Sequence, residues 1–556
     1  MRRVQRVIVP VIALAAAAST ALLAGTPAAT AGKPKPGPGR PDKVVVIVVD
    51  ALSREIVQKY GMTNVQALMR DGADSPKGYL GHLGSVTVVT HNVLTHGALP
   101  KNMGWTDEGY RDVDQVLAGQ GDDTSDMWLT SDLTKDQMFA LQDHADYPNL
   151  ADYLHAKRPG SKVVAISPKG YAAWGLGGGN GTGGAAADSI VTFSSRNYDC
   201  DGDGVNNWRG PTGVNVAGYL STPVCGPYYV DSASSKKYDT GQSPAWMYPL
   251  DGNRYTAGTD PDHQGSDVWA ADAAIDTMKN EDWSGVFVTL PGVDKAAHMW
   301  GSIDDDGGDD PQTHLANAAA VADEQVGKIV DQLRTSGELD DTLVVLTADH
   351  GSVPGRHFYG VDKADQGLFN WYYGDLENGK YLDPQPALKP LVDTGNVAMS
   401  YSDSMLRAWL EDQSPARVAQ AVKAMKGLPG VSAVWVRDGT RFRRATPVRS
   451  SAMSGPERAW FAKHAQELLD TTAAPYGADV IATLLDDTTY SVKGDHGGIQ
   501  RRSQQIPIVF AGGGVGSTDL KGGVRSVDIM PTVLKALGIP ATHALDGKAY
   551  QLPGVR

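Results

Sequence analysis

The sequence predicts an α/β fold in which a mostly parallel central sheet is sandwiched by helices. Short runs rich in Val and Ile recur along the chain, and their apolar character on both sides of the strand indicates burial on both faces. Helix-like segments separate these runs, an alternation typical of a parallel sheet covered on both faces. The five strongest strand candidates are residues 43–50, 162–167, 285–290, 342–349 and 506–512.

The clearest helix candidates are residues 64–72, 317–337 and 528–538, which lie between or after these strands. Two stretches interrupt the alternation. Residues of about 170–270 are rich in Gly, Asn, Asp and Tyr, and residues of about 385–480 carry helices around the strand 431–438. We interpret both as insertions, the second as a small α+β subdomain, within one core that spans residues 43–556.

The N-terminal residues predict export. Residues 1–31 have a basic start, an apolar middle and a small-residue exit, which is the pattern of a secretory signal peptide, and Arg2-Arg3 hints at the twin-arginine route. Residues 32–42 form a Pro- and Gly-rich linker. No later stretch is long and apolar enough to span a membrane, so we expect a secreted, extracellular protein.

The charge of the chain limits its partners. A net charge of −14 over 556 residues disfavours nucleic acid or an anionic membrane surface as a scaffold. An anionic substrate is compatible with this charge only if local positive groups attract it.

Carboxylates and imidazoles gather where predicted strands end. Because ligands of open α/β sheets bind beyond the carboxyl ends of the strands, these side chains are candidates for one site. Asp294 and His298 lie four residues apart, so one helical turn points both the same way. The mixture of carboxylate and imidazole suits one or two ions such as zinc. The six candidate ligands are Asp50, Asp294, His298, Asp349, His350 and His496.

Each candidate ligand also has an ordinary structural alternative. Asp50 is positioned to cap a helix, Asp294 and His298 fit a surface pair, and His496 fits a glycine-rich loop. Asp349 and His350 are less easily explained in this way, because two polar groups that end a buried run are costly without a partner.

The nucleophile candidates lie in residues 84–105, where a helix follows a glycine-rich loop. Free N–H groups at a helix start favour an attached phosphoryl group, and a coordinated hydroxyl becomes nucleophilic. Spacing alone does not distinguish Ser85, Thr87 and Thr90, and each of them is also able simply to cap the helix.

Six segments occur in order along most of the chain after residue 43: VVVIVVDAL, SVTVVTHNVLTHGALPKNMGW, GVDKAAHMWG, LTADHG, GDHGG and RSVDIMPTVLKALGIP. This ordered series resembles the alkaline phosphatase superfamily and, within it, the type I phosphodiesterase/nucleotide pyrophosphatase family. The resemblance implies an alkaline phosphatase-like catalytic domain, a small phosphate-ester substrate and two zinc ions, although other divalent transition metals would also suit the ligands.

The resemblance also implies a role for each residue. Asp50, Asp349, His350 and Thr87 would hold one zinc ion. The second ion would be held by Asp294, His298 and His496. Thr87, ten residues before Gly97, would be the nucleophile that forms a covalent phospho-enzyme.

The sequence departs from the family pattern at several positions. Residues 88–91 read Val-Val-Thr-His where nucleotide pyrophosphatases usually have Phe-Pro-Asn-His, and Met103 replaces a His. The family's phosphate-contacting Asn falls on Glu108, unless the register slips or Asn102 serves instead. His91 and His96 are expected to pack within the helix or behind the ligands. These departures leave nucleotide specificity open.

The first insertion contains a separate motif, DCDGDGVNNW. Alternating acids followed by Gly are typical of the start of a calcium loop, but the closing Glu is missing, so a solvated acidic turn is the alternative. The candidate calcium ligands are Asp199, Asp201, Asp203 and Asn207. An even pair of cysteines in an exported chain favours a disulfide between Cys200 and Cys225.

Three functions follow from these observations. The favoured one is a secreted hydrolase of phosphodiesters or nucleotide pyrophosphates that acts through a phospho-threonine at a two-zinc site. A phosphomonoesterase or phosphonate hydrolase on the same scaffold is the alternative. A non-catalytic binding protein is least favoured, because buried carboxylates would then lack their metal. Sulfatases are disfavoured, because their Cys/Ser-x-Pro-x-Arg motif is absent around Thr87.

Overall fold

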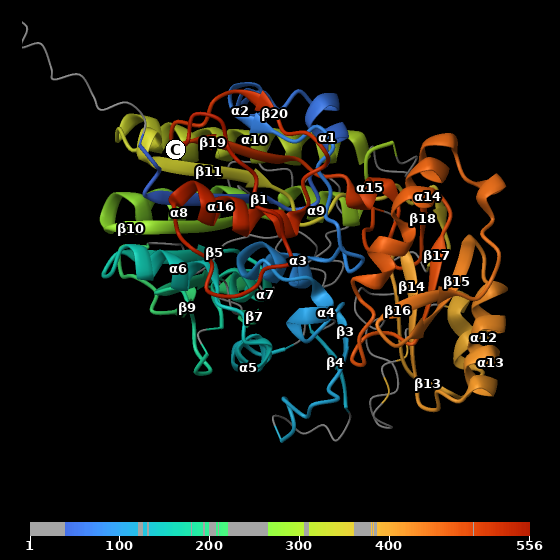
Figure 1. Ribbon diagram of the computed structural model, residues 1–556. Helices are drawn as coiled ribbons and strands as arrows, with labels where there is room; N and C mark the ends of the chain where they lie inside the picture. Colours follow the sequence, from blue (N-terminus) through green and yellow to red (C-terminus); the bar gives the residue numbers. More distant parts are fainter. Residues whose placement is uncertain are drawn as a thin grey trace, which may run out of the picture. The chain divides into compact units, whose positions relative to one another are not determined.

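The computed structural model describes residues 39–119, 126–130, 133–179, 181–192, 195–198, 207–209, 211–220, 265–304, 311–360, 380, 382, 386–492 and 494–556. Within these residues the largest sheet has the strand order β20-β2-β19-β11-β1-β10-β5-β6-β9 (Figure 1). From β11 to β6 all neighbouring strands are parallel, as the sequence predicts. The strands are β1 (Lys43–Val49), β2 (Ala73–Asp74), β5 (Lys162–Ile166), β6 (Ser189–Thr192), β9 (Thr212–Val214), β10 (Trp283–Leu290), β11 (Thr342–Thr347), β19 (Ile508–Gly512) and β20 (Thr518–Asp519).

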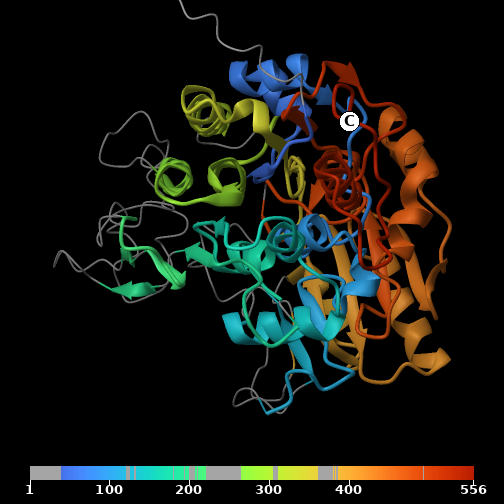
Figure 2. The same cartoon turned by 60° about the vertical axis from the view of Figure 1, so that its left-hand side comes forward.

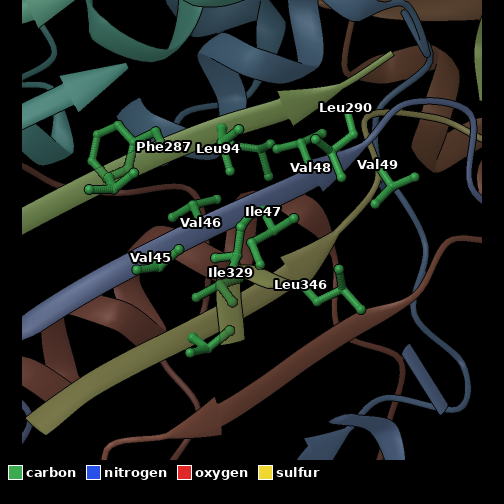
Figure 3. Packing of buried hydrophobic residues seen from close by; sticks show 14 of the residues in the cluster. Val45, Val46, Ile47, Val48, Val49, Leu94, Phe287, Leu290, Ile329 and Leu346 are labelled. Atoms are coloured by element: carbon green, nitrogen blue, oxygen red, sulfur yellow. The ribbon is translucent and has the colours of Figure 1, made fainter. Parts of the chain in front are cut away.

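Strand β1 lies between β10 and β11 at the centre of this sheet (Figure 3). Residues 44–49 of β1 are each at most 2% exposed, so both faces of the strand are covered. Leu94 from α3 (Thr87–His96) and Ile329 from α10 (Pro311–Thr335) pack into the same core. Because burying a Val or Ile side chain stabilises a fold by roughly 1.5–3 kcal/mol, this run anchors the strand whose end carries Asp50.

Helices cover the two faces of the sheet (Figure 2). One group of mutually contacting helices consists of α2 (Thr63–Asp71), α8 (Gly265–Asn280), α9 (Gly292–Trp300) and α10. The other consists of α3, α5 (Lys135–Ala145), α6 (Leu150–Lys157), α7 (Gly170–Gly177) and α16 (Ile529–Leu537). Among the residues that the structure describes, no helix has the length and apolarity needed to span a membrane.

The edges of the sheet differ from a purely parallel arrangement. The predicted strand 506–512 becomes β19, which runs antiparallel to β11. At the other end, β6 and β9 belong to the central sheet although they lie inside the stretch expected to be an insertion. The segment 175–184 before β6 is rich in glycine, so its composition gives no sign that the core continues beyond it.

A second sheet has the order β13-β14-β17-β15-β16, with every neighbour antiparallel. It is drawn in orange tones in Figure 1. Its strands are β13 (Val397–Ser402), β14 (Met405–Leu410), β15 (Val431–Asp438), β16 (Arg441–Arg444) and β17 (Val480–Leu484). These strands fall within or just beyond the range 385–480 expected for a small α+β subdomain.

Alternation along its strands gives the second sheet two apolar faces. Val434 packs with Met425 of α13 (Pro415–Lys426) on one face. The next residue, Trp435, packs with Phe461 of α14 (Gly455–Asp470) on the other face. The second sheet is therefore covered on both sides, like the first.

Glu457 in the first turn of α14 should make folding stability depend on pH. Its side chain accepts a hydrogen bond from the backbone N–H of Arg501, and burial raises its pKa to about 8. Because the folded pKa lies above the ordinary value of 4.5, this group stabilises the fold at low pH. That contribution is lost as the pH rises through about 8.

We expect the Glu457→Gln variant, which stays neutral, to lose this dependence. The free energy of unfolding of the wild type relative to the variant should fall between pH 5 and pH 9 by on the order of 1 kcal/mol or more. Urea unfolding of both proteins at the two pH values measures this difference. An unchanged difference would show that the Glu457 carboxyl does not titrate in this range.

Candidate active site

The six predicted ligands meet at the carboxyl edge of the central sheet. Asp50 follows β1, Asp349 and His350 follow β11, and α9 begins directly after β10 with Asp294 and His298 one turn apart. These strands are parallel neighbours, so their carboxyl ends share one edge. His496 arrives from the loop before α15 (Arg501–Gln504).

Asp294, His298 and His496 form one group whose ligating atoms are close enough to hold a metal ion. The Asp294 Oδ1 atom lies 3.1 Å from His298 Nε2 and 3.7 Å from His496 Nε2. His496 Nδ1 lies 3.1 Å from the carbonyl of Ser85, to which it can donate a hydrogen bond. This bond would fix the ring and leave Nε2 available as a ligand, an arrangement common behind metal-binding histidines.

A second such group consists of Asp50, Asp294 and His350. Asp50 Oδ1 lies 3.3 Å from His350 Nε2. Asp349, which the resemblance assigns to this ion, lies beside the group with its Oδ2 atom 3.6 Å from His350 Nε2. Its Oδ1 atom accepts hydrogen bonds from the backbone N–H groups of Ala51 and His350. Asp294 is thus a member of both groups.

The electrostatics of this cluster suit divalent cations. Asp50 and Asp349 are fully buried, and Asp50 Oδ1 and Asp349 Oδ2 accept no hydrogen bond from the described residues. Burial, together with the charges of Asp294 and Asp349, raises the pKa of Asp50 well above its usual value. Burial lowers the pKa of His496, which favours the neutral ring that ligates metals. Buried carboxylates and neutral imidazoles are the donor set of a zinc-like centre.

Lys169 also lies in the cluster, although no motif in the sequence singles it out. Its ammonium group donates hydrogen bonds to Asp50 Oδ2 and, over 2.7 Å, to Asp294 Oδ2. The residue is 4% exposed and precedes α7, just beyond the carboxyl end of β5. Since β5 pairs with β10, the rule that singled out Asp50 also applied to Lys169.

Thr87 is the first residue of α3, and no side chain caps this helix. Its Oγ1 atom lies 3.3 Å from His350 Nε2, so the hydroxyl faces the second ligand group. The competing hydroxyls are engaged elsewhere: Ser85 Oγ lies 3.0 Å from Ser503 Oγ, and Thr90 Oγ1 lies 3.4 Å from His82 Nε2. Thr87 is therefore the hydroxyl that the structure brings to the ligands.

Comparison with known proteins places this arrangement in a family. The sequence model of the type I phosphodiesterase / nucleotide pyrophosphatase family matches residues 44–498, a range that contains all six ligands and Thr87. The chain belongs to this family. Membership makes it a hydrolase that acts on phosphate esters.

Individual relatives agree with this assignment. The chain is 23% identical to the alkaline phosphatase PhoK of a Sphingomonas species over 92% of this chain and 91% of PhoK. It is 24% identical to the alkaline phosphatase PhoD of Zymomonas mobilis over 92% of this chain and 88% of PhoD. The crystal structure of the alkaline phosphatase PafA superposes with a TM-score of 0.57 at 16% identity. That match covers 92% of this chain and 98% of PafA, and it confirms the predicted alkaline phosphatase-like fold.

His91 lies behind the nucleophile. Its Nδ1 atom is 2.8 Å from the carbonyl of Thr87, and its Nε2 atom is 2.9 Å from the Thr289 hydroxyl. Nδ1 also lies 3.7 Å from Asp349 Oδ2. Burial lowers the pKa of His91 to about 4, so the ring is neutral. These contacts place His91 behind Thr87 and Asp349 and outside both ligand groups.

The departures from the type I phosphodiesterase pattern also have a structural context. Asn102 is exposed and donates a hydrogen bond over 2.8 Å to Asp546. Glu108 instead accepts a hydrogen bond from the Tyr401 hydroxyl on β13. Burial raises the pKa of Glu108 to about 7, so a substantial fraction of this side chain is neutral near pH 7. Among the described residues, neither Asn102 nor Glu108 makes a side-chain hydrogen bond to Thr87 or to the ligand groups.

The calcium and disulfide predictions lie outside the residues that the structure describes. This holds for Asp199, Asp201, Asp203 and both cysteines. Asn207 begins the short strand β8 (Asn207–Arg209).

Proposed function

We propose that this protein hydrolyses phosphate esters at a site for two zinc-like ions, with Thr87 as the nucleophile. One observation carries the proposal. The Thr87 hydroxyl, at the start of α3, lies 3.3 Å from a histidine of one ligand group, and that group shares Asp294 with the other. The Thr87 hydroxyl, the start of α3 and the candidate ligands thus lie next to one another. In-line displacement at phosphorus requires this proximity.

The residues present fit the metal ions. Asp294, His298 and His496 would hold one ion, and Asp50, His350 and Asp349 would hold the other with Thr87. Buried carboxylate oxygens without hydrogen-bond donors are otherwise costly, which supports this assignment. When bound, such ions lower the pKa of a coordinated hydroxyl and stabilise the charge that develops on the attacking and leaving oxygens.

The chain's own residues would bind and orient the phosphoryl group. The first amides of α3 make no intrahelical hydrogen bond, so their N–H groups are suited to its oxygens. The Thr87 oxygen would form a bond to phosphorus while the bond to the leaving alcohol breaks. Water would then hydrolyse the phospho-threonine, release phosphate and restore the Thr87 hydroxyl.

Within this chemistry we propose a phosphomonoester as the substrate class, although the sequence alone favoured a diester. A terminal phosphoryl group carries about one more negative charge than a diester, and Lys169 adds a buried positive charge next to both ligand groups. The relatives PhoK and PhoD, both alkaline phosphatases, are consistent with this choice.

Removal of the Lys169 charge should therefore change substrate preference. We expect the Lys169→Met variant to hydrolyse a chromogenic phosphomonoester about a hundredfold more slowly, a loss typical of removing one stabilising donor at an active site. Its hydrolysis of the matching phosphodiester should fall much less. The kcat/KM ratio for the two substrates measures this effect, and equal losses on both would refute a role in preference.

The same assay tests the proposed function in the wild type. Hydrolysis of either chromogenic ester that stops with chelator and returns with zinc supports a metal-dependent hydrolase. Absence of hydrolysis with both ions bound would favour the binding-protein alternative. Faster turnover of the diester than of the monoester would support the phosphodiesterase hypothesis instead.

Three proposals continue to rest on the sequence alone. We infer export from residues 1–31, a disulfide between Cys200 and Cys225, and a calcium loop at Asp199, Asp201, Asp203 and Asn207.

A further inference from the structure

A buried charged cluster joins the second sheet to the loop that precedes β3 (Gly109–Arg111). Arg407 lies on β14, is 1% exposed, and donates hydrogen bonds to two carboxylates. Its Nε atom donates to Asp107 from the loop before β3 (Gly109–Arg111). Its Nη2 atom donates over 2.7 Å to Asp403 in the turn between β13 and β14. The guanidinium thus links residues that are about 300 positions apart along the chain.

The Asp403–Ser404 turn lies directly against the loop that carries His496. The backbone N–H of Ser404 donates over 2.9 Å to the His496 carbonyl, and the Ser404 hydroxyl donates to the Gly497 carbonyl. Gly497 has a φ of +91°, and a Cβ at this position would overlap the Asp403 carboxylate. The His496 loop therefore packs closely against the Asp403–Ser404 turn. The position of Asp403 constrains the position of the His496 backbone.

The other side of the same loop contacts the segment that leads to Thr87. The backbone N–H of Gly497 donates over 3.1 Å to the Ser85 carbonyl, which also lies 3.1 Å from His496 Nδ1. His496 is thus held between Ser85, which lies just before α3, and the Asp403–Ser404 turn of the second sheet. The first contact orients the ring, and the second fixes the backbone from which the ring projects.

We propose that Arg407 is a positioning residue for the metal site: through Asp403 it holds the His496 loop and thereby sets the affinity of the Asp294–His298–His496 group for its ion. This inference rests on the proposed two-metal function. A backbone bridge between Asp495 and Val353 also holds the His496 loop. The planar guanidinium of Arg407 fixes the geometry of both carboxylates at once. The Asp50 side of the site is built instead on the ends of β1 and β11.

Substitution of Arg407 by Lys keeps the charge and removes the planar fork. We expect the Arg407→Lys variant to bind both ions, with the affinity for one of them lowered about tenfold to a hundredfold, as for other residues behind metal ligands. Activity lost at limiting zinc should return with excess zinc. Asp403→Asn, which weakens the same pair from the other side, should lower the affinity for the same ion.

Arg437→Lys is the matched control. Arg437 lies on β15 of the same sheet and pairs with Asp479, and the described residues show no contact between it and residues 494–498. Titration with Co²⁺, whose absorption reports each ion's coordination, gives the affinities of both sites. Circular dichroism and thermal unfolding establish that each variant is folded.

The outcomes separate the two proposals. Selective weakening of one ion in Arg407→Lys and Asp403→Asn, with Arg437→Lys unchanged, supports the inference. A folded Arg407→Lys protein with both affinities unchanged overturns the inference and leaves the proposed function standing. Equal weakening of both ions, or the same effect in the control, shows a merely structural role and also overturns it. A wild-type protein that binds fewer than two ions refutes the proposed function, and the inference falls with it.

Discussion

A Thr87→Ala protein should fold, keep its metal ions and lose nearly all activity. The six Asp and His ligands remain, so metal content should stay at the wild-type level. Turnover should fall by about three orders of magnitude or more, because water would have to attack phosphorus without the positioned hydroxyl. Hydrolysis of a chromogenic ester, alongside elemental analysis of the same preparation, measures both quantities.

Conservative and neighbouring substitutions make this expectation specific. Thr87→Ser retains the hydroxyl and should keep part of the activity. Thr90→Ala and Ser85→Ala should remain working enzymes, because these hydroxyls contact His82 and Ser503 rather than the ligands. Near-normal turnover in Thr87→Ala, together with loss in one of these two variants, would move the nucleophile to that residue.

The covalent step has its own signature. A brief reaction of the wild type with labelled substrate, stopped in acid, should leave phosphate attached to the peptide that contains Thr87. The Thr87→Ala protein should retain no label. Label on a histidine, or an absence of label under conditions of rapid turnover, would contradict a phospho-threonine.

The central sheet was predictable because its signal is local. A strand buried on both faces must be apolar throughout, and β1 and β11 follow such runs to within one or two residues. Strand direction was not predictable in the same way. The run that became β19 is as apolar as its neighbours, and nothing in its composition records that it pairs antiparallel with β11.

The second sheet was harder to predict because its strands include polar residues satisfied at long range. β14 contains Arg407, whose charge is unfavourable in a buried strand unless carboxylates from other segments surround it. The helices α13 and α14, with their ordinary amphipathic patterns, were visible in the sequence. β13 and β14 were not assigned as strands.

In the candidate site, too, contacts between residues far apart in the sequence could not be predicted. The six candidate ligands could be predicted because several of them follow buried runs, where polar groups are costly without a partner, and because the segments that contain them resemble those of a known family. Lys169 was missed because a single Lys after a strand is ordinary, and its importance arises from Asp50, 119 residues away. The resemblance divides the six residues between two ions, but the membership of Asp294 in both groups depends on the pairing of β1 with β10, which the sequence does not show.

Removal of one histidine should remove one ion. We expect wild-type protein to contain close to two zinc-like ions per chain, with any calcium additional. His350→Ala should lose the ion beside Asp50, and His496→Ala should lose the ion beside His298. Each variant should also lose most of its activity, because each histidine is one of the three Asp and His ligands of its site. His464→Ala is the control, since His464 is also buried but its ring packs against Trp460, and the described residues show no contact between His464 and the candidate ligands.

Loss of the ions should also destabilise the fold. Without them Asp50, Asp294 and Asp349 repel one another in a buried cluster, and only the lysines Lys169 and Lys295 pair with these carboxylates among the described lysine and arginine residues. Ions that bind the folded chain stabilise it by mass action, so chelator should lower the melting temperature of the wild type and added zinc should restore it. The shift should be smaller in His350→Ala and His496→Ala, which have one ion to lose. Two ions retained in either variant, or a melting temperature that ignores chelator, would show that these residues do not hold the metals.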